Sequence, residues 1–264
     1  MDGFLLLHKP VGITSFETLL IIKDLLPRAT RVGHSGTLDA FASGLLIVAI
    51  GRPATSHIKS FLILDKIYTA RAKWGQLTDT LDRTGKIISA TDQIPNKKVL
   101  EEIIATFGAL YKQTPPIYSA LKIQGKRLSD IARSARNKLD LHQIAKNKSQ
   151  NVYLYELTLL NVEDCFFQLR AHVSHGTYIR SLLNDIAQKA ESYATTHELV
   201  REQIGPFTIS QAHNLSDIRT QQDIFDRMIS IEQMIRQLNE YNRAVCARNS
   251  ENRLKLFKFK KHMS

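Results

Sequence analysis

Hydrophobic positions along the chain follow two spacings, one typical of strands and one typical of helices. Apolar runs at residues 4–7 and 45–50 predict buried strands, and residues 68–74 alternate apolar and polar positions as a half-buried strand does. Residues 15–26 and 98–107 place apolar side chains three and four positions apart, which predicts helices. The same criteria predict strands at 152–162 and 166–173 and a helix at 176–190. This order is too irregular for a doubly wound sheet and predicts a mixed α/β fold.

Two segments lack a spacing that would form a core. Residues 122–150 are rich in Lys, Arg, Ser, Asn and Gln, which predicts a solvated surface loop with a helix. Residues 243–264 interleave basic residues with leucine and phenylalanine. That composition is compatible with a disordered basic tail, a nucleic-acid-binding arm or a strand that docks onto the body. The 264 residues are enough for one large domain, or for one domain and a small appendage.

The charge balance indicates a class of partner. Lys and Arg total 36 against 25 Asp and Glu, a net charge of +11. Such an excess suits a polyanion, and it favours nucleic acid modestly over acidic membranes or acidic proteins. No apolar run approaches the roughly 18 residues of a membrane span, and the first residues lack the basic region of a signal peptide.

Cysteine and histidine spacings indicate neither disulfides nor a metal site. Cys165 and Cys246 are the two cysteines, and neither has the spacing of metal ligands or of a disulfide framework. The nine histidines show no spacing typical of zinc. We therefore expect a cytoplasmic protein that binds no metal.

The clearest candidate for chemistry is the glycine-rich loop at residues 33–44. Asp39 is the one carboxylate in this loop, and Gly33, Gly36 and Gly44 surround it. Glycine permits backbone conformations closed to other residues and lets a ligand approach closely. An isolated acid on such a loop is a candidate nucleophile or general acid–base. An equal alternative is that Asp39 caps the helix or turn that follows, as aspartate often does.

This loop resembles a motif of the pseudouridine synthases, in the branch that modifies the T-loop of tRNA. The family motif reads G-H-x-G-x-L-D-P-x-A-x-G, and the chain matches it at Gly33, His34, Gly36, Leu38, Asp39, Ala42 and Gly44. Ala40 stands where the family has proline and lacks the fixed φ of a proline ring. The resemblance implies that Asp39 is the nucleophile and that His34 enters the RNA where the target base was extruded. A core histidine or a loop donor is the alternative for His34.

Two further motifs are similar to those of the same family. Lys9 and Pro10 lie in L-L-L-H-K-P-V-G, which resembles L-D-K-P-x-G with His8 in place of aspartate. The resemblance implies that Lys9 and Pro10 brace the catalytic loop, with Lys9 at the substrate site, whereas the residues alone indicate a turn. Tyr68 matches the tyrosine of the K-x-Y motif, which implies stacking on the target base and a part in proton transfer. From the residues alone, Tyr68 is favoured as a core aromatic.

Two motifs imply acidic and basic groups around the RNA. Residues 75–82 resemble G-x-x-T-D-T-x-D, whose two acids either orient basic side chains or cap turns. Residues 115–122 closely match P-P-x-Y-S-A-L-K and lead into the basic segment. The family contacts RNA in this region, which implies that Lys122, Lys126 and Arg127 bind the substrate.

The last two motifs imply partners for Asp39 and for the base. The segment G-T-Y-I-R-S-L around Arg180 resembles G-T-Y-I-R-x-L, which implies that Arg180 pairs with Asp39 and that Tyr178 belongs to the substrate site. A guanidinium opposes protonation of a partly buried carboxylate and fixes its geometry through two parallel hydrogen bonds. Leu199 matches the leucine of L-R-R-x-x-x-G-P-F that packs against the base, although Val200 replaces the first arginine. Without the resemblance, Arg180 is a surface arginine and Leu199 a core residue.

These motifs follow the family's order over residues 3–215 and resemble the bacterial TruB-type tRNA pseudouridine synthases. The resemblance implies an α/β (α+β) fold with a central, mainly antiparallel mixed sheet, and a catalytic domain at 1–215 with the basic insert at 122–150. It implies isomerisation of uridine 55 in the T arm of tRNA by a monomer that needs no cofactor. Residues 216–264 are few for the family's PUA domain, which we expect to be reduced or absent.

Two other functions fit parts of the pattern. An RNA chaperone or binding module would keep the fold without the chemistry, but Asp39, Tyr68 and Arg180 are all present. A relative that modifies guide-RNA targets within a ribonucleoprotein is disfavoured by the bacterial form of the motifs at 118–122 and 176–180. A secondary role of the enzyme in tRNA folding is compatible with the same residues.

Overall fold

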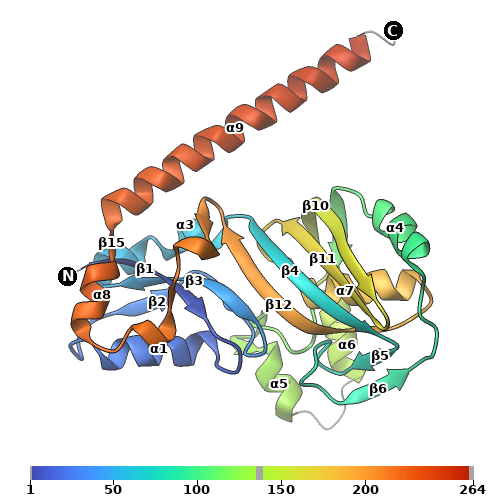
Figure 1. The fold of residues 1–264 in the computed structure, drawn as a ribbon, viewed down its shortest axis with the longest axis horizontal. Helices are drawn as coiled ribbons and strands as arrows, with labels where there is room; N and C mark the ends of the chain where they lie inside the picture. The colour runs from blue at the N-terminus through green and yellow to red at the C-terminus, as the bar shows by residue number, and fades with distance from the viewer. Residues whose placement is uncertain (1, 135–138, 262–264) are drawn as a thin grey trace.

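One long mixed sheet organises the molecule (Figure 1). The structure, a computed structural model, describes residues 2–134 and 139–261. The main strands lie in the order β14 (His213–Asn214), β1 (Gly3–Lys9), β3 (Ser43–Ile50), β12 (Ala194–Ile204), β4 (Lys66–Trp74), β11 (Phe166–Val173), β10 (Gln150–Glu163) and β7 (Leu110–Gln113). The β1–β14 and β3–β12 pairs are parallel, and the other pairs along this order are antiparallel. The predicted α/β fold with a mainly antiparallel mixed sheet is confirmed.

Shorter elements complete the fold. Strands at the margins of the main sheet are β2 (Val32–His34), β13 (Phe207–Thr208) and β15 (Ile229–Ser230). Separate hairpins are β5 (Gln76–Thr78) with β6 (Ile87–Ala90), and β8 (Lys122–Ile123) with β9 (Lys126–Arg127). The α-helices are α1 (Ser15–Asp24), α2 (Arg52–Ser56), α3 (Ile58–Leu62), α4 (Lys97–Ala105), α5 (Leu128–Ser134), α6 (Leu139–Lys146), α7 (Ile179–Lys189), α8 (Gln221–Arg227) and α9 (Ile231–Lys261). Two 3₁₀ turns, η1 (Ile209–Gln211) and η2 (Leu215–Asp217), follow β12.

Strands β1 and β3 are covered on both faces, which explains their continuous apolar sequence. Phe4 and Leu6 of β1 point into one hydrophobic cluster, and Leu5 and Leu7 point into another, which Ile22 of α1 joins. Both strands were predicted from these runs, and the prediction is confirmed. They form a rigid platform from which the loop at 33–44 projects.

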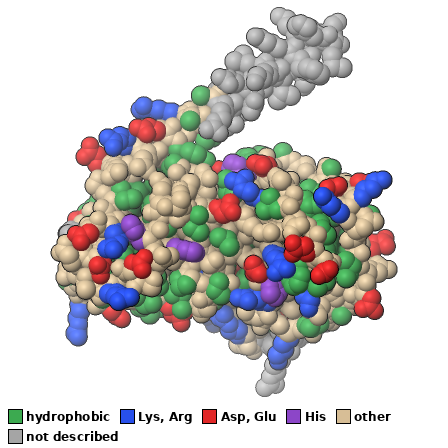
Figure 2. Space-filling model, viewed as in Figure 1, with side chains coloured by type: hydrophobic (Ala, Val, Ile, Leu, Met, Phe, Trp, Pro, Cys, Tyr) green, Lys and Arg blue, Asp and Glu red, His purple; other side chains and the backbone are tan. Residues whose placement is uncertain are grey.

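The β12–β4–β11 part of the sheet has one covered face and one open face. Alternate residues of β4 pack with α4 and α7 on the covered face. The open face carries ion pairs and hydrogen bonds in place of apolar contacts, and acidic, basic and histidine side chains lie side by side over it (Figure 2). Arg170 lies 3.2 Å from Glu202, and Arg71 lies 3.3 Å from Glu198. Because these polar groups satisfy one another, this face is stable in water without a covering layer.

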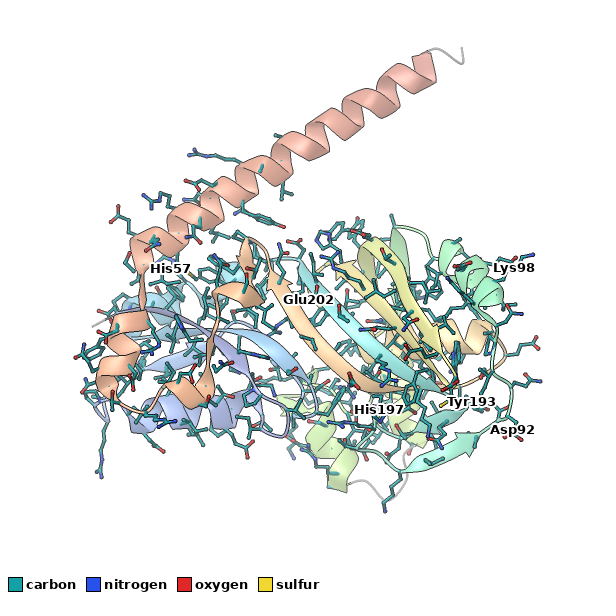
Figure 3. All side chains as sticks on the ribbon, in the orientation of Figure 1. His57, Asp92, Lys98, Tyr193, His197 and Glu202 are labelled. Atoms are coloured by element: carbon teal, nitrogen blue, oxygen red, sulfur yellow. The ribbon has the colours of Figure 1, made fainter. Side chains whose placement is uncertain are left out.

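This open face explains a strand that the sequence analysis missed. No element was predicted at 194–204, where the structure has the long strand β12. Glu202 and His197 of β12 face the open side, partly exposed (Figure 3). Small polar residues such as Thr195 and Thr196 are buried on the sheet instead of large apolar ones. The strand therefore has no clear alternation of hydrophobic and polar residues, and its identity depends on its neighbours β3 and β4.

The basic insert contains a small core of its own, which corrects the expectation that residues 122–150 keep no core-forming period. The hairpin β8–β9 leads into α5 and α6. These elements surround a cluster of buried residues made by Ile117, Leu128, Ala132, Leu141 and Ala145. Within each helix the two buried residues lie four positions apart, which is a helical spacing, but the many polar residues between them obscured it.

The residues beyond β12 pack against the same strands as the rest of the fold. β15 pairs with β1, and Met234 and Leu238 of α9 join the cluster that Phe4 lines. Helix α9 then projects away from the body (Figure 1). The backbone of residues 243–261 is helical, so the alternative of a docking strand is wrong. Side chains from 248 onward lie outside the described part, and the division at residue 215 stays a prediction.

Within residues 2–134 and 139–261, no helix combines the length and the apolar composition needed to cross a membrane.

Asp65 joins α9 to the sheet, and this contact predicts acid-sensitive stability. The Tyr241 hydroxyl donates to the two Asp65 oxygens at 2.6 and 2.7 Å, and His172 Nε2 contacts the same carboxylate. Burial disfavours the ionised Asp65, but the hydrogen bonds from His172 and Tyr241 outweigh it and hold the pKa of Asp65 below its usual 3.8. The ionised group therefore stabilises the fold above about pH 4, and this stability is lost as the pH falls through the lowered pKa.

We expect Asp65→Asn to lower the Tm at pH 7 by about 2–6 °C, because a hydrogen-bonded charge is lost from a chain of this size. The Tm of the variant should then fall less steeply than that of the wild type between pH 5 and pH 3. Thermal melts across this range test the prediction, with exposed Asp92→Asn as the control. The prediction would be contradicted if the Tm of wild type and that of Asp65→Asn fell equally between pH 5 and pH 3.

Candidate active site

The loop that carries Asp39 lies between β2 and β3 and is held by the segment before α1. Ser15 Oγ accepts a hydrogen bond from the Leu38 amide at 2.8 Å and donates to the Leu38 carbonyl at 3.0 Å. The Gly12 amide donates to the Ala40 carbonyl at 2.7 Å. Asp39 is thus fixed from both sides, although its side chain is 37% exposed. The structure presents this carboxylate at the surface on a rigid backbone, as a reacting group requires.

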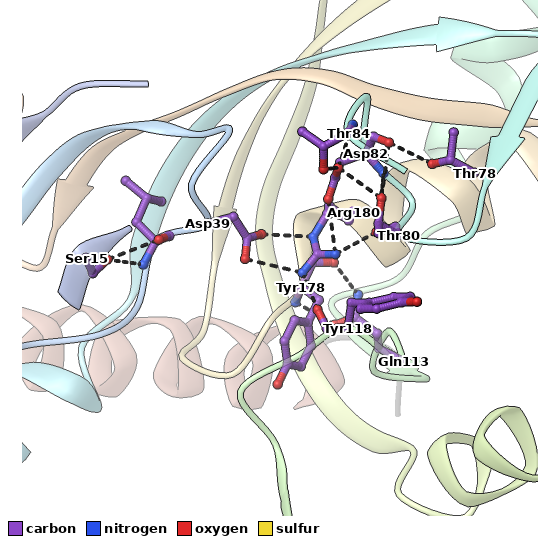
Figure 4. Close-up of polar contacts among 11 residues, drawn as sticks. Ser15, Asp39, Thr78, Thr80, Asp82, Thr84, Gln113, Tyr118, Tyr178 and Arg180 are labelled. Carbon is purple, nitrogen blue, oxygen red and sulfur yellow. Dashed lines mark hydrogen bonds and ion pairs between the residues drawn. The ribbon is translucent and has the colours of Figure 1, made fainter. Parts of the chain in front are cut away.

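Asp39 forms an ion pair with Arg180, which lies 141 positions later in the chain. Arg180 Nε is 2.9 Å from one carboxylate oxygen, and Nη2 donates to the other at 3.4 Å (Figure 4). The Arg180 side chain is only 4% exposed. Two parallel hydrogen bonds from one planar guanidinium fix both the position and the orientation of the carboxylate. The structure therefore brings together the pair that the resemblance implied.

The rest of the Arg180 guanidinium is also bound. It donates to the Thr80 carbonyl at 2.6 Å, to the Tyr118 carbonyl at 2.9 Å and to Asp82 Oδ2 at 3.4 Å. Its partners come from the loop after β5 and from the segment that leads into the insert (Figure 4). A buried guanidinium with partners on every side is held in one conformation, so Asp39 has a fixed counterion.

Asp82 has both of the roles that the sequence left open. Besides its contact with Arg180, its Oδ1 accepts hydrogen bonds from the Thr80 hydroxyl at 3.0 Å and the Thr84 amide at 2.9 Å. It therefore closes its own turn and orients the arginine. Sequence reasoning named it only as one of two acids in a motif, and the fold was needed to show which basic group it faces.

Tyr68 and Leu199 lie on the covered face of neighbouring strands, beside the Asp39 loop. Their exposed fractions are 9% and 6%, and both belong to the hydrophobic cluster that Leu38 and Phe41 join. The two side chains thus form part of an apolar floor next to the carboxylate. This placement is compatible both with packing on a base and with a purely structural role.

Lys9 and Arg201 support the loop from within the core. Lys9 is fully buried, and its ammonium donates to the Pro10 and Ile13 carbonyls at 2.7 Å each. Burial lowers the pKa of Lys9 to about 8, while the charge of Asp39 acts in the opposite direction. This position agrees with the bracing role that the resemblance implied and leaves the ammonium no exposed surface for a substrate.

Arg201 is a site residue that sequence reasoning missed. It is 1% exposed, and its guanidinium donates to the Leu45 carbonyl at 2.8 Å and the Gly36 carbonyl at 3.2 Å. It therefore ties strand β12 to both ends of the Asp39 loop. The one signal in the sequence was its place two residues after Leu199 in the L-R-R-like motif.

The remaining predicted residues lie around this centre. His34 ends β2 and is partly exposed, and Lys122 and Lys126 are exposed on the β8–β9 hairpin. The Arg127 side chain lies outside the described residues. Tyr178 is the residue before α7, and burial raises the pKa of its phenol. Among the described residues, the hairpin lysines make no direct contact with Asp39.

In the described part of the chain, no group of three His, Cys, Asp or Glu side chains lies close enough together to hold a metal ion. What the site offers is an oriented carboxylate, a buried guanidinium and an apolar floor. These groups suit a reaction in which the carboxylate attacks a planar ring, or removes a proton near it, while the face of the ring packs on the apolar floor.

Gly44 is needed where β3 passes β12, and its substitution should be strongly destabilising. Its φ is +116°, and a Cβ there would lie 2.6 Å from the Arg201 amide nitrogen. We expect Gly44→Ala to lower the free energy of unfolding by more than about 3 kcal/mol, because backbone strain adds to a clash with a rigid strand. Urea denaturation measures this directly.

Gly12 offers a matched control for the backbone strain alone. Its φ is +98°, but an added Cβ would meet no heavy atom within 4 Å. Gly12→Ala should therefore lose only about 1–2 kcal/mol. Equal losses of unfolding free energy in the two variants would show that the close approach of β12 does not add to the cost of Gly44→Ala.

Comparisons with known proteins bear on this geometry. A family model described as "TruB family pseudouridylate synthase (N terminal domain)" matches residues 23–179. A protein of Clostridium acetobutylicum named tRNA pseudouridine synthase B is 35% identical over 240 residues, which cover 91% of this chain and 80% of that protein. A protein of Thermotoga maritima with the same name is 34% identical over 233 residues, which cover 88% of this chain and 72% of its own length.

A solved structure is also similar. The fold superposes with a TM-score of 0.60 and 27% identity on a chain of the structure titled "Crystal Structure of a Cbf5-Nop10-Gar1 Complex". The match covers 82% of this chain and 53% of that chain, so this chain spans about half of the solved one.

Proposed function

Because the chain belongs to the TruB family of pseudouridylate synthases, we propose that it converts uridine 55 in the T-loop of tRNA to pseudouridine. Membership of this family, with relatives named tRNA pseudouridine synthase B over most of the chain, makes it a tRNA pseudouridine synthase, an isomerase. The observation that carries the proposed catalysis is the Asp39–Arg180 ion pair at 2.9 Å, and the similarity of residues 33–44 to the motif of the T-loop branch supports the site.

The T arm binds first, in this proposal, against the basic insert. Lys122, Lys126 and Arg127 come from a hairpin at the start of that insert and neutralise backbone phosphates. The insert has its own small core, so it moves as a unit and closes over the RNA. A net charge of +11 favours the encounter.

The target uridine then leaves its stack and enters the site. His34 fills the space that the base vacates, which offsets part of the unstacking free energy of a few kcal/mol. The base lies between Tyr68 and Leu199, which supply an aromatic and an aliphatic contact from neighbouring strands. Tyr178 lines the same site, and Lys9 acts from within by holding the loop.

Asp39 starts the chemistry, either as a nucleophile or by removing a proton that initiates cleavage of the N1–C1′ bond. The uracil rotates while it stays bound, and a new bond forms between C5 and C1′. The proton on C5 is lost, N1 gains a proton, and Tyr68 assists this last transfer. Substrate and product have the same atoms and oxidation state, so the residues of the site suffice and no cofactor is required.

A role in tRNA folding without chemistry is the second candidate, and a guide-RNA function is the third. The Asp39, Tyr68 and Arg180 side chains lie around one loop, which favours catalysis over a binding module. Relatives at 34–35% identity carry the name tRNA pseudouridine synthase B, which favours a free tRNA over a guided target.

Tritium release from tRNA labelled at C5 of uridine tests the proposal. Release of one equivalent, with pseudouridine mapped to position 55 by mass spectrometry, is the expected result. Release from another position would overturn the site assignment while leaving the enzyme class intact. Binding of tRNA without any release would support the folding role instead.

A further inference from the structure

The N-terminus of helix α7 is held by one buried amide that the mechanism above does not use. Tyr178 precedes α7 and has no capping hydrogen bond from its own side chain. Gln113, the last residue of β7, accepts a hydrogen bond from the Tyr178 amide at 2.7 Å and donates to the Tyr178 carbonyl at 2.9 Å (Figure 4). Gln113 is 1% exposed, so water cannot replace either bond. One side chain thus fixes both backbone groups of the residue two positions before Arg180.

The same region holds both ends of the insert. Ser181, next to Arg180, donates through its hydroxyl to the Thr114 carbonyl at 2.8 Å. The Thr114 hydroxyl lies 2.9 Å from the Ser149 hydroxyl, which joins the segment that leads into the insert to the insert's end. Gln150 then donates to the Gly176 carbonyl at 3.1 Å.

These contacts connect the insert to the ion pair at two levels. The segment at 176–181 is bonded to residues on both sides of the insert, and the Tyr118 carbonyl between them accepts a bond from Arg180 Nη2. A shift of the insert therefore acts on the backbone that carries Arg180 and on the guanidinium itself. Gln113 ends β7, where the segment that leads into the insert leaves the sheet, so it is the fixed point of this arrangement.

We propose that Gln113 is a positioning residue that holds Arg180 against Asp39 and couples this ion pair to the placement of the RNA-binding insert. The inference rests on the proposed function, because its effect is on the isomerisation that Asp39 starts. Displacing a catalytic group by about 1 Å is enough to slow a reaction about 100-fold. Loss of the amide frees the first turn of α7 to shift by such a distance.

The chemistry of the amide explains why glutamine is suited to this position. An amide donates and accepts at once, as the Tyr178 N–H and C=O require. An ionised glutamate would still accept from the Tyr178 amide, but it would place a buried negative charge opposite the Tyr178 carbonyl with no proton to share. A protonated glutamate would restore both bonds, so Gln113→Glu is a substitution whose defect should be relieved by acid.

The test compares single-turnover rate constants and Kd for tRNA in wild type, Gln113→Leu, Gln113→Glu and Ser192→Ala. Ser192 is the matched control, because its buried hydroxyl donates to the Gln93 carbonyl at 2.6 Å beyond the far end of α7, away from Tyr178. We expect Gln113→Leu to lower the rate constant about 100-fold with Kd changed less than about threefold. Ser192→Ala should lower the rate constant less than about threefold even where its Tm falls equally.

Rates for Gln113→Glu are measured from pH 8 to pH 5.5 as a ratio to wild type, and we expect this ratio to rise as the pH falls. If Gln113 has a merely structural role, activity falls in proportion to Tm in Gln113→Leu and Ser192→Ala alike, and that result would overturn the inference. A ratio of the Gln113→Glu rate to the wild-type rate that does not change with pH would also overturn the inference. If Gln113→Leu does not fold, this pH measurement alone decides the test. An inactive wild type overturns the proposed function and with it this inference, whereas an active wild type matched by Gln113→Leu overturns only the inference.

Discussion

Replacing Asp39 by asparagine should abolish isomerisation while tRNA binding stays almost unchanged. The amide keeps the size and shape of the carboxylate, so the loop held by Ser15 and Gly12 is preserved. It lacks the charge needed to attack the sugar or base or to remove a proton. We expect the single-turnover rate constant to fall about 10⁴-fold or more, since losses of this size follow removal of a reacting group.

Tritium release at saturating enzyme measures the rate, and filter binding measures Kd, which should stay within about threefold of wild type. Asp92→Asn makes the same change of charge on an exposed side chain that follows β6 and should alter neither quantity (Figure 3). Near-normal release by Asp39→Asn would show that Asp39 does not react. A parallel loss of tRNA binding would assign it to docking instead.

Replacing Arg180 by lysine should slow the reaction by about 10²–10³-fold, although the positive charge is kept. The guanidinium bonds both Asp39 oxygens and reaches Asp82 and two backbone carbonyls. A lysine ammonium has three donors on one atom and cannot span these acceptors. Asp39 would then rotate, and buried acceptors would lose their partners.

The rate constant should therefore fall much more than the affinity for tRNA, which the same two assays separate. Arg71→Lys is the control, because Arg71 is 31% exposed and pairs with Glu198 on the open face of the sheet. Surface pairs of this kind contribute about 1 kcal/mol or less, so this variant should retain turnover within about twofold. Turnover unchanged in Arg180→Lys would mean that charge alone, and not the two-bond geometry, supports Asp39.

Much of the framework was predicted because its determinants are local. The apolar runs in β1 and β3 report strands buried on both faces, and alternation in β4 reports a strand with one covered face. The turn into α1 is equally local, with the Thr14 hydroxyl accepting from the Glu17 amide at 3.0 Å. Each of these patterns is complete within a short stretch of sequence, so it can be recognised without knowledge of distant neighbours.

The elements that were missed depend on neighbours. Strand β12 carries charged residues on its open face and small polar residues beneath, so it resembles a loop until Arg71 and Arg170 supply partners for its glutamates. The composition of the insert predicts a solvated loop because its few apolar residues are scattered among polar ones, although they meet in one cluster when the helices pack. In both cases the stabilising contacts join residues that are far apart in sequence.

For the site, the sequence by itself determined which chemical groups are present and which loop carries them. The sequence shows Asp39 among glycines, an arginine in a helical motif and a tyrosine at the start of a strand. The resemblance of these motifs to one family implied the roles of the three residues. Only the tertiary structure decided that Arg180 shares its guanidinium between Asp39 and Asp82, and that Arg201 closes the loop from behind.

The physical reason is the nature of the interactions. Hydrophobic burial is nondirectional and leaves a periodic trace in the sequence, whereas a hydrogen-bonded ion pair depends on angles and distances that packing sets across more than a hundred positions. Gln113 is the clearest example, because its amide is unremarkable in sequence and gains its meaning only where β7 meets the start of α7.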